Sequence, residues 1–113
     1  MQNYKPSLTE AQIKRAVADF LEYGCNQGKW YSDRLQAGEF IEVRGKTRRR
    51  VKGCRAGTAD FFVLKSGRVI FLEIKSPKGK QRPEQATFQK LIESEDAYYF
   101  IIRSVEELAE ILK

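Results

Sequence analysis

The sequence predicts an α/β domain in which a small mixed β-sheet is flanked by helices, in the order α-β-β-β-β-α-β-α. Apolar residues recur at helical spacing near both ends of the chain. Two short apolar runs, at 61–64 and 69–72, flank the turn signal KSGR, which is typical of a β-hairpin. A third apolar run, AYYFII at 97–102, predicts a buried strand. The 113 residues are enough for one compact domain, so 1–113 is treated as a single unit.

Composition favours a polyanionic partner and removes several kinds of chemistry. The net charge is +6 with a pI near 9.4, which suits nucleic acid. The absence of histidine excludes nucleases that use a histidine base and zinc sites of the Cys/His type. Cys25 and Cys54 match no metal motif and are interpreted as reduced thiols of a cytoplasmic protein. No apolar run is long enough to span a bilayer, and no signal peptide is visible.

The first helix follows residues 1–6, which we expect to be a loose terminus. A capping box starts at Ser7, and a second register starts at Thr9. The helix is predicted to run to about Tyr23, with Gly24 at its C′ position. Glu10 is the acid of this helix that falls on its apolar stripe, and both a capping and a functional role are open. The stripe comprises Ile13, Val17, Phe20 and Leu21.

The segment 26–56 contains a predicted basic hairpin. Trp30 and Tyr31 start a short strand or a loop, EFIEVR at 39–44 alternates as a strand does, and 47–51 is a return strand. A solvated charged face is the common reading of such a basic run, and a clamp on a phosphate backbone is the functional one. Trp30, Tyr31 and Phe40 either stack on bases or belong to the core. The basic residues are Arg44, Lys46, Arg48, Arg49, Arg50, Lys52 and Arg55, to which Lys78 and Lys80 add a later loop.

The hairpin at 61–72 brings acidic residues together. With two central turn residues, the register places Asp60 opposite Glu73, and Lys75 emerges on the same face as Glu73. Two carboxylates at that spacing repel unless a cation lies between them, which favours a divalent-metal site beside a lysine. The alternative is that all three are ordinary surface charges. Both faces of the hairpin are apolar, so we expect the sheet to be covered on both sides, where unpaired charges are costly.

The remaining elements follow the hairpin. A basic polar loop at 76–80 leads to Pro83, which fits the first position of a helix ending near Ser94. Gln85 in its first turn is placed to reach the carboxylates, or else serves as a cap. A capping box at Ser104 opens the last helix. The stripes predicted to be buried are Phe88, Leu91 and Ile92 in the first of these helices, and Val105, Leu108, Ala109 and Leu112 in the second.

The motifs of the chain are, in order, an acid in the first helix, GTAD at 57–60, EIK at 73–75 and PEQ at 83–85. In the order of these motifs the chain resembles the PD-(D/E)XK nuclease superfamily. More narrowly, the chain resembles the VRR-NUC family in its short stand-alone form, along nearly its whole length. The resemblance implies a restriction-endonuclease-like core. Ala59 departs from the family, which often has proline before the aspartate.

The resemblance implies a metal-dependent phosphodiesterase acting on DNA. Asp60 and Glu73 would ligate Mg²⁺ or Mn²⁺, with the backbone carbonyl of Ile74 as a further ligand. Lys75 would orient the attacking water and stabilise negative charge. Gln85 would support the site, and Glu10 would match the acid of the first helix, as a further catalytic or metal-binding residue.

The resemblance also implies partners and context. Stand-alone members look like homodimers that cleave branched DNA, such as flaps or four-way junctions, in replication, repair or recombination. A short nuclease of this type suggests a phage or bacterial genome and the host cytoplasm. Three alternatives stay open: an archaeal-type Holliday junction resolvase, a catalytically silent basic DNA-binding module, and a small protein-interaction domain whose weak DNA binding depends little on salt.

Overall fold

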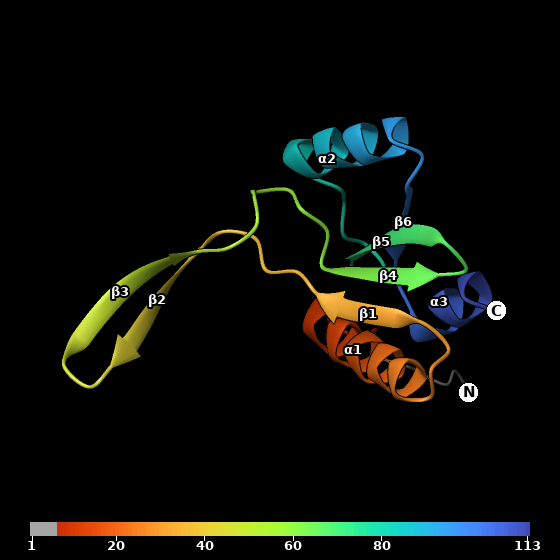
Figure 1. The fold of residues 1–113 in the computed structure, drawn as a ribbon. Helices are drawn as coiled ribbons and strands as arrows, with labels where there is room; N and C mark the ends of the chain where they lie inside the picture. Colours follow the sequence, from red (N-terminus) through yellow and green to blue (C-terminus); the bar gives the residue numbers. More distant parts are fainter. Residues whose placement is uncertain (1–6) are drawn as a thin grey trace, which may run out of the picture.

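A four-stranded mixed sheet forms the centre of the molecule, with helices on both faces (Figure 1). The computed structural model describes residues 7–113, so the expectation of a loose terminus at 1–6 lies outside the described residues. Helices α1 (Glu10–Asn26) and α3 (Val105–Ile111) lie on one side of the sheet, and α2 (Pro83–Ser94) lies on the other (Figure 1). No helix in this part of the chain is both long and apolar enough to cross a membrane.

The sheet has the strand order β1-β4-β5-β6. Its strands are β1 (Tyr31–Arg34), β4 (Phe61–Lys65), β5 (Arg68–Ile74) and β6 (Tyr98–Ile102). Strand β5 pairs in parallel with β6, whereas β1, β4 and β5 pair antiparallel, so the expected mixed sheet is confirmed. Strand β1 forms at the segment for which the sequence allowed either a strand or a loop. As a result five strands precede α2, one more than the predicted order has.

The β4–β5 hairpin has the predicted register. Leu64 pairs with Val69 and Phe62 with Phe71. The two central turn residues, Ser66 and Gly67, have φ angles of 52° and 74°. Both residues are therefore left-handed, as in the two-residue turns whose twist matches that of a hairpin. The tight turn fixes the register along both strands, and this places the end of β5 beside the residue that precedes β4.

Helix α1 begins in the second of the two predicted registers and ends later than expected. Thr9 is the N-cap, and its capping box closes with Gln12. The predicted end at Tyr23 is wrong, because the helix continues to Asn26 with Gly24 buried inside it. A Cβ atom at Gly24 would lie 1.9 Å from Cζ2 of Trp30. This glycine therefore makes room for Trp30 and does not end the helix.

The core lies between the sheet and the α1/α3 layer. Trp30 belongs to this side, because its ring stacks on Phe20 and its Nε1–H donates to the carbonyl of Leu21 at 3.0 Å. Base stacking by Trp30 is thereby excluded in this structure. The buried core residues are Ile13, Val17, Leu21, Phe61, Val63, Ile70, Leu72, Ile74, Ile102, Leu108 and Leu112, with Val105 packed against them in part.

The opposite face of the sheet is covered over part of its area. Phe88 of α2 meets Phe71 edge-on, with ring centroids 5.2 Å apart. Leu64 and Val69 remain 43% and 37% exposed, so the expectation of full cover on both faces is wrong. Leu91 is 63% exposed, and this corrects its predicted burial. A single helix of three turns cannot span the whole face.

Strands β2 (Glu39–Arg44) and β3 (Thr47–Lys52) form a separate two-stranded sheet. This ribbon, here called the arm (residues 39–52), projects away from the body at the end of the sheet where β4 begins (Figure 1). The predicted strand at 39–44 and the return strand are confirmed. They do not join the central sheet, and their side chains are mostly exposed.

Candidate functional site

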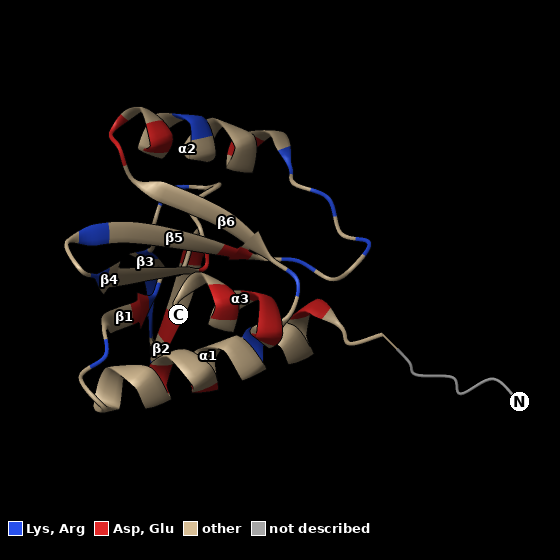
Figure 2. Cartoon of the chain, turned by 90° about the vertical axis from the view of Figure 1, so that its right-hand side faces the viewer, with Lys and Arg blue, Asp and Glu red and all other residues tan. Residues whose placement is uncertain are grey.

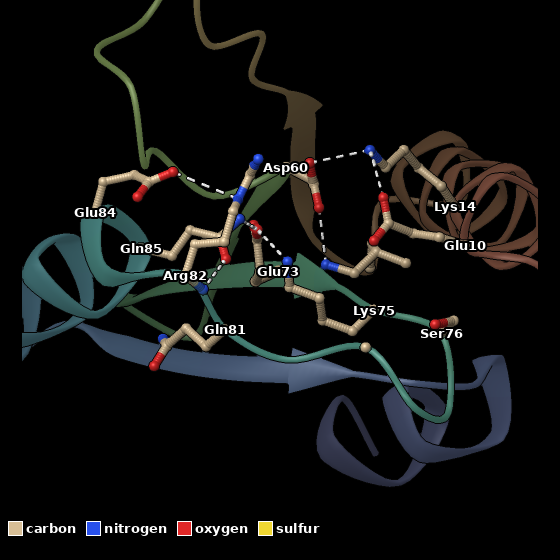
Figure 3. Close-up of polar contacts among 12 residues, drawn as sticks. Glu10, Lys14, Asp60, Glu73, Lys75, Ser76, Gln81, Arg82, Glu84 and Gln85 are labelled. Carbon is tan, nitrogen blue, oxygen red and sulfur yellow. Dashed lines mark hydrogen bonds and ion pairs between the residues drawn. The ribbon is translucent and has the colours of Figure 1, made fainter.

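The predicted site residues line one cleft at the end of the central sheet. The cleft has a volume of about 370 Å³ and is bordered by the starts of α1 and α2, the residue before β4 and the end of β5. Its walls include Glu10, Asp60, Glu73, Lys75 and Gln85 (Figure 3). Residues separated by up to 75 positions are thus brought together by the hairpin register and by the two helix starts.

Glu73 and Gln85 form the buried floor of this cleft. Their residue exposures are 3% and 4%. Gln85 Nε2 donates to Oε1 of Glu73, and Gln85 Oε1 accepts from the backbone N–H of Arg82 at 2.8 Å (Figure 3). The side-chain amide of Gln85 therefore connects the start of α2 to the Glu73 carboxylate. Within residues 7–113, Oε2 of Glu73 is the one buried side-chain nitrogen or oxygen with no hydrogen-bond partner.

Asp60 is held by the backbone of the neighbouring strand. Its Oδ2 accepts from the N–H of Ile74 at 2.8 Å, and its own backbone N–H donates to the carbonyl of Leu72 at 3.0 Å. Its other carboxylate oxygen, Oδ1, lies 3.2 Å from Nζ of Lys14 (Figure 3). Ile74 therefore contributes its amide to the site, while its side chain is buried in the core.

Lys14 is a site residue that sequence reasoning missed. It lies one helical turn after Glu10, and its ammonium group bridges Glu10 Oε2, at 3.9 Å, and Asp60. The signal was present, because a residue four positions after Glu10 shares its helix face. Arg82, which also lines the cleft, was missed because it precedes the predicted helix by one residue.

Lys75 is a buried ammonium group directly after β5. Its side chain is 8% exposed, and Nζ lies 3.9 Å from Oε1 of Glu73. Its backbone N–H donates to the carbonyl of Ile102 at 3.0 Å, which continues the β5–β6 pairing past the strand end. A buried lysine is costly unless it is paired, so its place beside Glu73 argues against an ordinary surface charge.

The electrostatics of the cleft are centred on Glu73. Burial, and after it the adjacent Asp60 carboxylate, together raise the pKa of Glu73 from 4.5 to about 7, against the opposing effects of Lys75 and Lys14. The site therefore carries a carboxyl group that is half-protonated near neutral pH. An added cation would favour its ionised form.

The oxygen donors of the cleft suit a divalent cation. No cluster of three or more carboxylate, thiol or imidazole groups that could hold a metal exists within residues 7–113, and Glu10 stays at the rim with its side chain 47% exposed. Two carboxylates, Asp60 and Glu73, remain. This set fits Mg²⁺, which is typically held by one or two carboxylates and shares substrate phosphate oxygens. The unpartnered Oε2 and the raised pKa of Glu73 are the features that a cation would relieve.

The predicted basic residues fall into two groups. Lys80 lines the cleft, and Lys78 lies on the same loop between β5 and α2, along which Lys and Arg positions are coloured blue in Figure 2. This loop is fastened by Arg103, whose Nη1 donates to the carbonyls of Ser76 at 2.6 Å and Gly79 at 2.8 Å. The second group lies outside the cleft, with Arg55 in the loop that follows the arm. On the arm itself are Arg44, Lys46, Arg48, Arg49, Arg50 and Lys52.

Comparison with known proteins identifies the fold. No protein-family model matches the chain, and no curated protein matches it. Among solved structures, the chain is similar to one described as "VRR_NUC domain", with a TM-score of 0.60, 18% sequence identity, and coverage of 93% of this chain and 96% of that chain. The chain therefore has the fold of a VRR_NUC domain, as the sequence motifs predicted.

Proposed function

We propose that this protein is a metal-dependent DNA endonuclease that hydrolyses phosphodiester bonds in the cleft around Asp60. The observation that carries the proposal is the buried Glu73, whose Oε2 has no partner among the described residues, beside Asp60 and the buried Lys75. A binding module gains nothing from two acids at its phosphate site, because they repel the backbone. The VRR_NUC fold and the motif resemblance support the same chemistry.

In this proposal the carboxylates of Asp60 and Glu73 hold Mg²⁺ or Mn²⁺, and the Ile74 carbonyl completes the protein's contribution. The bound cation would polarise the phosphate and make a water molecule a better nucleophile. Gln85 keeps Oε1 of Glu73 engaged, so that Oε2 stays available. The N–H of Ile74 holds Asp60 in the same way through Oδ2. Glu10 and Lys14 close the rim of the site.

Lys75 is the group that acts on the reacting atoms. Its ammonium donates a hydrogen bond that orients the attacking water, and its charge offsets the negative charge that grows on the phosphate oxygens. The water oxygen bonds to phosphorus and loses a proton to the solvent, one P–O ester bond breaks, and the departing oxygen takes up a proton from the solvent. No covalent enzyme intermediate is needed, and the chain has no histidine to serve as a base.

The substrate is proposed to be branched DNA, a flap or a four-way junction, in replication, repair or recombination in the cytoplasm of a bacterial host. A homodimer would bring two such clefts to a symmetric junction. Light scattering tests the dimer directly: the mass of two chains supports it, and the mass of one chain refutes it.

The nuclease proposal is tested by cleavage of end-labelled linear, flap and four-way-junction DNA with Mg²⁺, with Mn²⁺ or with EDTA. Asp60→Ala is run in parallel. Cuts that need metal and vanish in the variant support the nuclease, and the preferred DNA identifies the substrate. Tight, salt-sensitive binding without cuts under any metal would instead indicate a silent DNA-binding module.

A further inference from the structure

The two faces of the arm differ in how their charges are compensated. On one face, Glu42 contacts Arg44 and lies 3.5 Å from Arg49, so this single acid partly neutralises two arginines. On the other face, Arg48 pairs across the strands with Val43, and Arg50 with Ile41. Arg48 makes no ion pair with any residue of the described chain. Arg50 forms an ion pair with Glu39, with Nε 3.7 Å from Oε2.

The second face is therefore both cationic and apolar. Ile41 and Val43 are 67% and 61% exposed, although both are aliphatic, and they alternate along β2 so that they share one side of the ribbon. Exposed aliphatic groups set between arginines suit a partner that offers negative charge and apolar edges together. The groove of duplex DNA has this composition, because phosphates flank base edges that include thymine methyl groups.

The arm is fixed to the cleft at its base. Cys54 N–H donates to the carbonyl of Gln36 at 2.7 Å, and Gly53 N–H donates to that of Gly38 at 2.7 Å, which locks the two connecting segments together. The N–H of Leu35 donates to the carbonyl of Asp60 at 2.8 Å. The segment that enters the arm is thus bonded to the proposed metal-binding residue. A ligand held by the arm is placed relative to Asp60.

The arm has dimensions that match a duplex. Each strand has six residues. A strand of this length extends about 20 Å, which equals about six base pairs of B-DNA. A two-stranded ribbon fits the major groove, which is about 12 Å wide. Binding of single strands relies instead on aromatic stacking, and the arm has one aromatic residue, Phe40.

We propose that the face of the arm that carries Ile41, Val43, Arg48 and Arg50 seats in the groove of a duplex DNA segment beside the cleaved bond. The substrate would then need about six base pairs of duplex on that side of the cut. The position of the cut rests on the proposed function, whereas the duplex contact itself requires no cleavage.

The experiment measures DNA affinity by fluorescence anisotropy in EDTA, so that catalysis plays no part. The probes are a duplex of about two helical turns and one of its single strands. The test variant is the double substitution R48A/R50A, and the matched control is R44A/R49A, which removes the same charge from the face that holds Glu42.

We expect R48A/R50A to weaken duplex binding by about tenfold and to lower the slope of log affinity against log salt by about two. The control should weaken binding by less than about twofold, because its arginines are already paired with Glu42. Equal losses in the two variants, or no loss in either, would overturn the proposal. If R48A/R50A loses as much affinity for the single strand as for the duplex, the proposal that the arm selects duplex DNA is overturned.

Two further measurements keep the outcome clear. R48A/R50A could also act by disturbing the ribbon, so a second variant removes the arm altogether. In this variant a short glycine turn joins Gly38 to Gly53, which are already hydrogen-bonded to each other. We expect the armless variant to lose at least as much duplex affinity as R48A/R50A. If I41S/V43S lowers the molecular mass in light scattering without changing duplex affinity, the face binds a second copy and the proposal fails. If the protein binds duplex DNA through the arm but does not cleave it, the nuclease proposal is refuted and the arm proposal stands.

Discussion

The backbone N–H of Ile74 donates a hydrogen bond to Oδ2 of Asp60 at 2.8 Å. This bond joins the last residue of β5 to the residue that precedes β4, beyond the regular pairing of the two strands. It fixes the Asp60 side chain on the same side of the sheet end as Glu73. The hairpin turn, about six residues away along each strand, thus determines the separation of the two carboxylates through the register.

Gln85→Ala should impair both the site and the start of α2. The variant loses the donor to Glu73 and the acceptor for the Arg82 N–H, so we expect a loss of stability of about 1–3 kcal/mol. Without that donor, the pKa of Glu73 should rise further, which moves the acidic limb of the activity profile to higher pH. Urea unfolding and a pH series of cleavage rates check this. Gln89→Ala, one turn later, should leave the pH profile unchanged.

Glu73 should make the metal-free protein less stable as the pH rises. Its pKa is raised from 4.5 to about 7, so between these values the folded protein binds more protons than the unfolded chain. The stabilisation is complete below about 4.5 and is lost as the pH passes through about 7, which amounts to about 3 kcal/mol. Glu73→Gln should flatten this dependence in unfolding experiments, whereas Glu106→Gln should not. An unchanged slope in Glu73→Gln would show that another group titrates.

Mg²⁺ should stabilise the protein more above the pKa of Glu73 than below it. Ionisation of Glu73 supplies one of the two carboxylates, so metal binding competes with its proton. At a metal concentration about a hundredfold above the dissociation constant, the gain is about 2.7 kcal/mol. Thermal unfolding with and without Mg²⁺, about one unit on either side of that pKa, measures the difference. An equal gain in Asp60→Asn would mean that the ion binds elsewhere.

Arg103→Ala should loosen the loop between β5 and α2. The guanidinium holds the carbonyls of Ser76 and Gly79, and this loop carries Lys78 and Lys80. Trypsin should therefore cut the variant faster after these lysines. The DNA affinity of the variant should fall, and the rate at which it cleaves bound DNA should change less. Arg68→Ala, at the opposite end of β5, is the matched control. Equal proteolysis of the wild type and Arg103→Ala would show that other contacts order the loop.

The hairpin and the residues at its end were predictable from sequence. A two-residue turn and the strand period of two suffice to place Asp60, Glu73 and Lys75 on one face, and the structure has that register. Gln85 was also placed correctly near the site, because Pro83 fixes the start of α2 and therefore the direction of its first turn. Whether these residues bind metal and cleave DNA stays a prediction.

Other features depended on contacts that no local pattern records. Gly24 has the signature of a helix end, yet it lies inside α1 because Trp30 occupies the space above it. The alternation in 39–44 predicts a strand but does not say whether that strand joins the central sheet or forms an arm. The sequence places Lys14 on the same helix face as Glu10, but its contact with Asp60 at 3.2 Å depends on how α1 packs against the sheet.

The most direct test of the proposed active site compares DNA cleavage by the wild type and Lys75→Met under single turnover with Mg²⁺. Methionine keeps most of the buried volume and removes the charge beside Glu73. Lys90→Met, on the exposed side of α2, is the control. We predict that Lys75→Met cleaves about a hundredfold to a thousandfold more slowly, while its DNA affinity in EDTA stays within about twofold of the wild type. Near-normal cleavage by Lys75→Met would contradict the assignment of this cleft as the active site.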